Sequence, residues 1–131
     1  MMKLPLLTAR MLLRLTFVLQ AILGIVILVS GSGQPVRSIH VIVGVVFVFS
    51  LWVIAAFAAG VSADRPMVAV TVVWGFIVLA FGLTQDQVLA GSNHWIINVA
   101  HPLAGIIAIG LGEMLGAKAA RRYKDTTPAA A

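Results

Sequence analysis

Apolar residues run along the chain in four long stretches, separated by short segments rich in glycine, serine, proline, asparagine and charged residues. The stretches cover about residues 11–30, 39–60, 67–87 and 94–117. Each has roughly the 20 residues that a helix needs to cross a bilayer core of about 30 Å. The pattern therefore predicts an all-α, integral membrane four-helix bundle, with residues 1–124 as a single four-span unit and 125–131 as a disordered tail.

Composition indicates that lipid rather than water surrounds these helices. Of the 131 residues, 61% are hydrophobic and 10% are charged, whereas soluble domains have roughly half and a quarter. The chain has no cysteine, which excludes disulfides, thiolate-held zinc, cysteine-bound iron–sulfur clusters and thioether-attached heme. We therefore expect membrane lipid to contact the helices. We expect no soluble domain in the chain.

The basic residues divide unequally between the two sides of the predicted bundle. With four spans, Arg37 alone falls on one side, and the other side receives Lys3, Arg10, Arg14, Arg65, Lys118, Arg121, Arg122 and Lys124. Positively charged residues favour the cytoplasmic side, so both termini are predicted to be cytoplasmic (N-in/C-in) in a multi-pass protein of the cell membrane. This bias accounts for the net charge of +5 without nucleic acid as a partner.

The first apolar run is preceded by basic residues, as in a signal peptide. The run is long for that purpose, and Ser30–Gly33 is a poor cleavage site. We therefore expect the run to be kept as the first span.

Two histidines stand near the start of the second and fourth stretches, at His40 and His101, and each is followed four residues later by glycine, at Gly44 and Gly105. In the predicted orientation both imidazoles lie near the outer face. Imidazole inside a membrane is costly unless it has a partner, and two imidazoles suit the two axial positions of a heme iron. The pair predicts one heme b held by bis-histidine ligation near that face.

Glycines are expected to make room for the porphyrin. Gly44 and Gly105 lie one turn below the predicted ligands, and Gly24 in the first span and Gly75 or Gly82 in the third would relieve the flanking helices.

Polar groups near the same face supply further candidates. Arg37 lies one turn before His40 and is expected to pair with a heme propionate. Pro102 cannot donate to the carbonyl of Asn98. Either the fourth helix begins near this proline, or a kink there exposes Asn98 to a propionate or to water.

The two halves of the chain resemble each other. Gly31-Ser32 followed by His40-x-x-x-Gly44 is echoed by Gly91-Ser92 followed by His101-x-x-x-Gly105, at offsets of 60 and 61 residues. This two-helix internal repeat places the histidines at equivalent positions on diagonal helices.

Other polar residues favour structural readings. His94, next to Trp95, is typical of an ordinary loop histidine. Gln85–Gln87 indicate a solvated helix end, with a site above the heme as the alternative. Glu113 is expected to pair with Lys118 and the basic tail, and a proton-relay role is the alternative. A ridge of small residues is typical of close packing inside the bundle or in a dimer; its members are Ala100, Ala104, Ala108, Gly112 and Gly116.

Leu19–Gly24, the loop Ser30–Gly33 and the histidines near the start of spans two and four resemble one half of the heme A synthase family. The resemblance implies a four-helix unit with a bis-histidine heme site on the outer side, and the architecture is also similar to transmembrane b-type cytochromes. The family carries a glutamate three residues before a ligand histidine and an arginine after it, where this chain has Arg37 and Val41. The resemblance thus implies heme binding more than the synthase reaction.

These observations predict a membrane b-type cytochrome for electron transfer or heme-linked redox at the outer face. A six-coordinate iron favours electron transfer, with a redox protein or a quinone as the candidate partner and a homodimer as the alternative to a monomer. Two other functions stay open: a heme-modifying or heme-handling enzyme of the synthase type, and a cofactor-free subunit of a larger membrane complex.

Overall fold

The computed structural model describes residues 3–31, 33–61, 64–89 and 91–125. Its helices are α1 (Lys3–Ser30), α2 (Gln34–Gly60), α3 (Arg65–Thr84) and α4 (His94–Asp125). Each is long and apolar enough to cross a membrane. The predicted all-α, four-helix architecture is confirmed. Of the predicted tail, Asp125 ends α4 and the remainder lies outside the described residues.

The helices do not end where the apolar stretches end. α1 begins at Lys3, α2 at Gln34 and α4 continues to Asp125, so each of these helices is longer than the apolar stretch that it contains. Proline in the first turn starts α2, and the Ala-, Lys- and Arg-rich end of α4 has high helix propensity. α3 is shorter than predicted, because the chain turns after Thr84.

Two residues next to helix ends, Gly31 and Asp64, have a left-handed backbone conformation. Gly31 follows α1 with φ of +58°, a conformation that glycine adopts without strain. Asp64 precedes α3 with φ of 33°, and its carboxylate accepts a hydrogen bond from the Met67 amide. Lys118 of α4 donates to the same carboxylate and holds the pKa of Asp64 below its usual range. The connection before α3 is thus fixed to α4.

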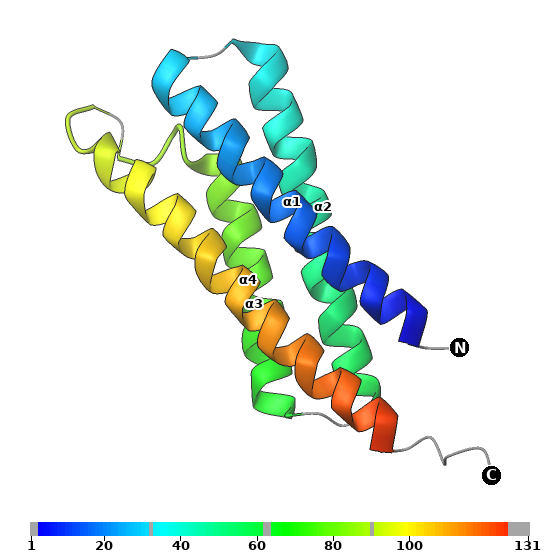
Figure 1. Ribbon diagram of the computed structural model, residues 1–131. Coiled ribbons are helices and arrows are strands. Elements are labelled where there is room, and N and C mark those ends of the chain that lie inside the picture. Colours follow the sequence, from blue (N-terminus) through cyan, green and yellow to red (C-terminus); the bar gives the residue numbers. More distant parts are fainter. Residues whose placement is uncertain (1–2, 32, 62–63, 90, 126–131) are drawn as a thin grey trace.

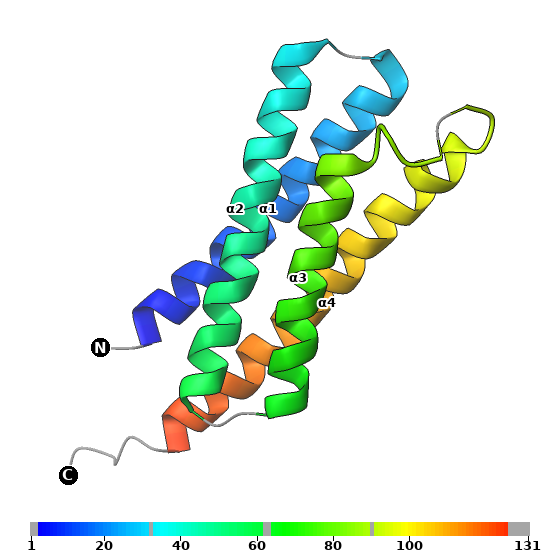
Figure 2. The same ribbon diagram turned by 180° about the vertical axis from the view of Figure 1, so that it is seen from behind.

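The chain forms two antiparallel hairpins, α1/α2 and α3/α4, that pack on each other (Figures 1 and 2). We call the end with the α1–α2 and α3–α4 connections the hairpin end, and the end with both termini the terminal end. α2 contacts α4 across the bundle, whereas the described parts of α1 and α3 do not contact each other. His40 and His101 therefore belong to the two helices that meet across the bundle.

The core lies in the terminal half. Its fully buried large apolar side chains include Leu6 and Leu13 of α1, Leu51 and Ile54 of α2, and Leu115 of α4. Most of the predicted ridge packs inside the bundle, since Ala104, Ala108, Gly112 and Gly116 are buried. A Cβ at Gly112 would lie 2.5 Å from the Leu13 side chain, and one at Gly116 would lie 2.8 Å from Arg10 Cδ. These two glycines let α1 approach α4 closely.

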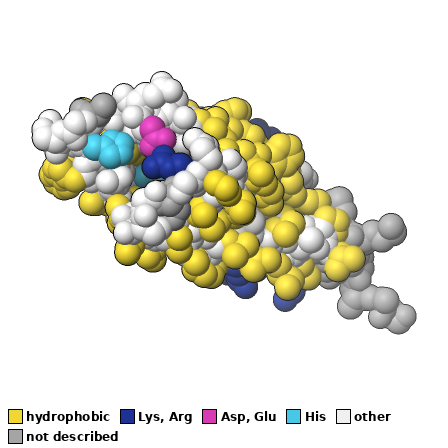
Figure 3. All heavy atoms as spheres, turned by 90° about the horizontal axis from the view of Figure 1, so that it is seen from above, with side chains coloured by type: hydrophobic (Ala, Val, Ile, Leu, Met, Phe, Trp, Pro, Cys, Tyr) yellow, Lys and Arg dark blue, Asp and Glu magenta, His cyan; other side chains and the backbone are white. Residues whose placement is uncertain are grey.

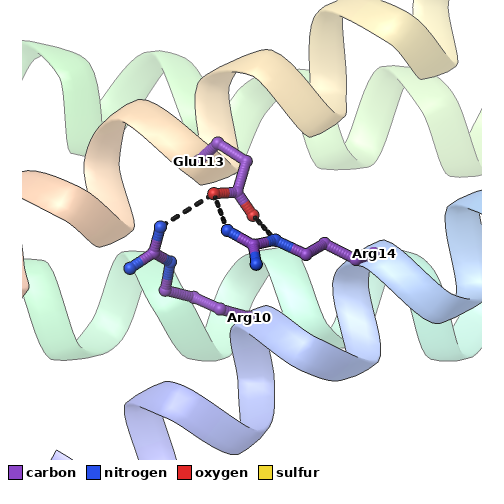
Figure 4. A network of polar contacts seen from close by, with 3 residues as sticks. All are labelled: Arg10, Arg14 and Glu113. Carbon is purple, nitrogen blue, oxygen red and sulfur yellow. Dashed lines mark hydrogen bonds and ion pairs between the residues drawn. The ribbon is translucent and has the colours of Figure 1, made fainter.

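Glu113 of α4 binds two arginines of α1 (Figure 4). Arg10 Nη2 donates to Glu113 Oε2 at 2.8 Å, and Arg14 donates through Nε and Nη2 at 2.8 and 2.7 Å. The prediction that Glu113 pairs with Lys118 is wrong. Five residues rotate a helix by about 140° beyond a full turn, so Lys118 points elsewhere and pairs with Asp64.

The outside of the bundle is apolar. Large hydrophobic side chains are exposed on every helix, for example Met11, Ile42, Phe76 and Leu103. An apolar surface of this extent is unusual for a soluble monomer and suits contact with lipid.

Gly112 gives a direct test of the close packing between α1 and α4. We expect Gly112→Val to lower the free energy of unfolding by about 1–3 kcal/mol, because the new side chain overlaps Leu13 and Leu51. Gly110→Val is the matched control, since a Cβ there meets nothing within 4 Å. Thermal unfolding in detergent, followed by circular dichroism, measures both. Equal losses in the two variants would contradict this packing.

Glu113 tests the ionic link between the same helices. Glu113→Gln should lower the free energy of unfolding by about 1–3 kcal/mol, because Arg10, whose side chain is 18% exposed, loses its counter-charge. Asp64→Asn removes an exposed ion pair while an amide can still cap α3. The same unfolding assay should show a much smaller loss for that control, and the reverse order would refute the role given to Glu113.

Candidate functional site

A cavity of about 490 Å³ lies in the hairpin half, between all four helices. Its volume is within the usual range of about 300–1,000 Å³ for cofactor and small-molecule sites. Most of its wall is apolar, from Phe17 and Ile25 of α1 to Val78 and Leu79 of α3. Every predicted site residue lines it: Gly24, Arg37, His40, Gly44, Asn98, His101 and Gly105.

The imidazoles of His40 and His101 face each other across this cavity. Their ring centroids are 6.1 Å apart and the ring planes are inclined by 50°. Two imidazoles on opposite sides of one metal ion, with bonds of about 2 Å, have centroids about 6 Å apart. The spacing therefore leaves room for one metal ion between the rings.

Three buried polar atoms around the cavity have no hydrogen-bond partner among the described residues: His40 Nδ1, His101 Nδ1 and Gln20 Oε1. A buried polar atom without a partner costs about 1–3 kcal/mol. The cluster is consistent with a bound ligand or ordered water.

Each histidine packs on a glycine of the other helix in its own hairpin. A Cβ at Gly24 would lie 3.6 Å from His40 Cε1, and a Cβ at Gly82 would lie 3.4 Å from His101 Cε1. The two hairpins thus present their imidazoles in the same way. Of the two glycines considered in the third span, Gly82 lines the cavity, whereas Gly75 lies against the indole of Trp52.

Gly44 and Gly105 differ in their surroundings. A Cβ at Gly44 would lie 2.5 Å from Gln20 Nε2, so this glycine admits the Gln20 amide. A Cβ at Gly105 meets nothing within 4 Å, so the space in front of it is open. Gln20 was not predicted as a site residue. The signal that could have found it is a lone amide in the apolar run of the first span, one turn before Gly24.

Polar side chains surround the mouth of the cavity at the hairpin end, where Figure 3 shows histidine, acidic and basic side chains gathered. Arg37 Nη1 donates to Asp86 Oδ2 at 3.0 Å, so Arg37 has a partner within the chain, which the sequence did not indicate. His94 also lines the cavity. It is the first residue of α4 rather than a loop residue.

Pro102 lies inside α4, eight residues after the helix begins at His94. The alternative that the helix starts near this proline is therefore wrong. Because proline has no amide hydrogen, the carbonyl of Asn98 lacks its usual donor four residues on. Asn98 and Pro102 both line the cavity, so the position where the helix loses this hydrogen bond lies beside it.

His40 and His101 are the two candidate metal ligands that face each other in the cavity, whereas His94 and Asp86 line it without forming a metal-binding group with that pair. Within the described residues no group of three or more His, Cys, Asp or Glu side chains could hold a metal ion. A zinc ion in a protein usually has three or four protein ligands, so these two are too few on their own.

Comparisons of the chain with protein-family models, with curated proteins and with solved structures find no match. The cavity and its residues are therefore the features that indicate a function.

Proposed function

We propose that the protein is a membrane b-type cytochrome that binds one heme b through His40 and His101, for electron transfer or heme-linked redox chemistry. The observation that carries this proposal is the pair of imidazoles, 6.1 Å apart, inside a cavity of about 490 Å³. The largely apolar wall of the cavity supports it, as does the resemblance to heme A synthases and transmembrane b-type cytochromes.

The number of ligands favours a macrocycle over a bare metal ion. Two imidazoles complete the coordination of an iron whose other four ligands are porphyrin nitrogens. The open space at Gly105 and the separation of α1 from α3 suit a flat ligand between the hairpins. The apolar walls suit its ring, and Arg37 at the mouth suits its carboxylates.

The distribution of charge supports an orientation in the membrane. Arg10, Arg65 and Lys118 belong to the terminal half, together with the basic end of α4. We therefore propose that the protein lies in the cytoplasmic membrane with both termini in the cytoplasm. The hairpin end, with the cavity mouth, then faces outward.

A bound heme supplies a one-electron iron couple. His40 and His101 would both hold the heme iron, and an iron held by two histidines favours electron transfer. The apolar walls keep water from the ring, and the polar mouth gives one edge access to the outer surface. A redox protein or a quinone at that surface is the proposed partner.

Optical spectra of the detergent-purified protein, oxidised and then reduced with dithionite, test this proposal. We expect sharp, split visible bands on reduction in the wild type. His40→Ala and His101→Ala should each lose the bis-histidine spectrum, because each removes one axial ligand. His94→Ala is the matched control and should keep it, since His94 lies at the mouth.

A colourless wild type after expression with ample heme would refute the heme proposal. In that case the cofactor-free subunit becomes the better description, and it predicts normal folding of the His40→Ala, His101→Ala double variant. Loss of the bands in His94→Ala but not in His40→Ala would instead show that the ligands are misassigned.

Gly105→Leu tests whether the cavity itself is the binding site. The leucine enters space that is open in front of Gly105 and should exclude the porphyrin while both histidines remain. We expect at least a tenfold loss of bound heme per protein, measured from the absorbance of the reduced pyridine adduct. Gly110→Leu, outside the cavity, should retain full occupancy, and equal occupancy in both variants would argue against this cavity.

A further inference from the structure

Arg37 and Asp86 form an ion pair at the rim of the cavity. Arg37 lies on α2, one turn before His40, and Asp86 lies in the turn that follows α3. Among the described residues that line the cavity, Arg37 is the one arginine or lysine and Asp86 is the one carboxylate. The pair therefore sets the charge of the entrance.

We propose that Asp86 occupies a carboxylate-binding site at Arg37, and that a carboxylate of the incoming cofactor displaces it. This inference deepens the proposed heme site and rests on it. It assigns Asp86 a role that the sequence did not suggest: it competes with the ligand for the guanidinium.

The exposure of the two side chains makes this exchange feasible. The Arg37 side chain is 44% exposed and that of Asp86 is 67% exposed, and exposed ion pairs are weak because water and salt screen them. The Asp86 side chain is already mostly hydrated in the pair, so its release into solvent changes its hydration little. The bond in the structure uses Nη1 of Arg37 with a single carboxylate oxygen, so it is not the stronger two-bond arrangement available to arginine and a carboxylate.

The position of the pair explains why a cofactor carboxylate reaches the same place. Arg37 lies three residues before His40 on α2, about 4.5 Å along the helix axis, so a ring held between the two histidines would bring its outer edge near the guanidinium. Acidic groups on that edge then meet the guanidinium, while a neutral edge does not. The site thus favours a porphyrin with free carboxylates over its ester, and Asp86 keeps Arg37 neutralised until such a ligand arrives.

Release of ferric heme b from the loaded protein to an excess of apomyoglobin measures the exchange. Asp86→Asn should slow release about two- to fivefold, because it removes the competitor for Arg37. Arg37→Gln should speed release about fivefold. In the Arg37→Gln background, Asp86→Asn should have no further effect. For heme b dimethyl ester, which lacks free carboxylates, neither variant should differ from the wild type.

Asp64→Asn is the matched control, since it also removes an exposed carboxylate paired with a basic side chain, at the other end of the bundle. It should leave release unchanged. If Asp86→Asn still slows release in the Arg37→Gln background, or slows release of the ester, the cause is the net charge near the cavity and not competition for Arg37. Either result would overturn the exchange.

The remaining outcomes separate this inference from the proposed function. If the wild type binds both porphyrins and Asp86→Asn releases heme b at the wild-type rate, the heme site stands and the exchange is wrong. If the wild type binds neither porphyrin, the heme site fails and the exchange fails with it.

Discussion

The close approach of α1 and α4 in the terminal half is the constraint on which the rest of the structure depends. Gly112 and Gly116 have no side chain, which leaves room for the side chains of Leu13 and Arg10. Glu113 binds Arg10 and Arg14 of the facing helix. Apolar packing around Leu51, Ile54 and Leu115 completes the contact. Because these contacts hold the helices together in the terminal half, the helices can stay apart in the hairpin half and leave a cavity there.

The two halves of the bundle differ in how closely they are packed. The terminal half supplies most of the buried core, whereas the hairpin half surrounds a cavity of about 490 Å³ and has fewer packing contacts there. The proposed heme would add contacts with the apolar walls of this cavity, and the packed terminal half holds the helices together without them.

The four helices could be predicted from the sequence, because apolar length is a local property. The predicted site residues also prove to line one cavity, since the spacing of histidine and glycine along a helix is local as well. Ion pairs between side chains of different helices could not be predicted from the sequence. Glu113 met Arg10 and Arg14 rather than Lys118, and Arg37 met Asp86, since helix rotation and loop path decide such pairs. Gln20 was missed for a related reason: one amide in an apolar run has no periodicity, and its contact with Gly44 exists only after α1 and α2 pack.

The two hairpins present their histidines alike, yet the cavity is not symmetric. Gly24 and Gly82 support the two imidazoles at similar distances, as a two-helix repeat would produce. One turn further into the bundle the halves diverge, because the Gln20 amide fills the space beside Gly44 while the space beside Gly105 is open. The mouth adds a second difference, with Arg37 contributed by the first hairpin and Asp86, His94 and Asn98 by the second. The heme that we propose between the two histidines would therefore meet different surroundings in the two hairpins. These differences, rather than the histidines themselves, would set its orientation.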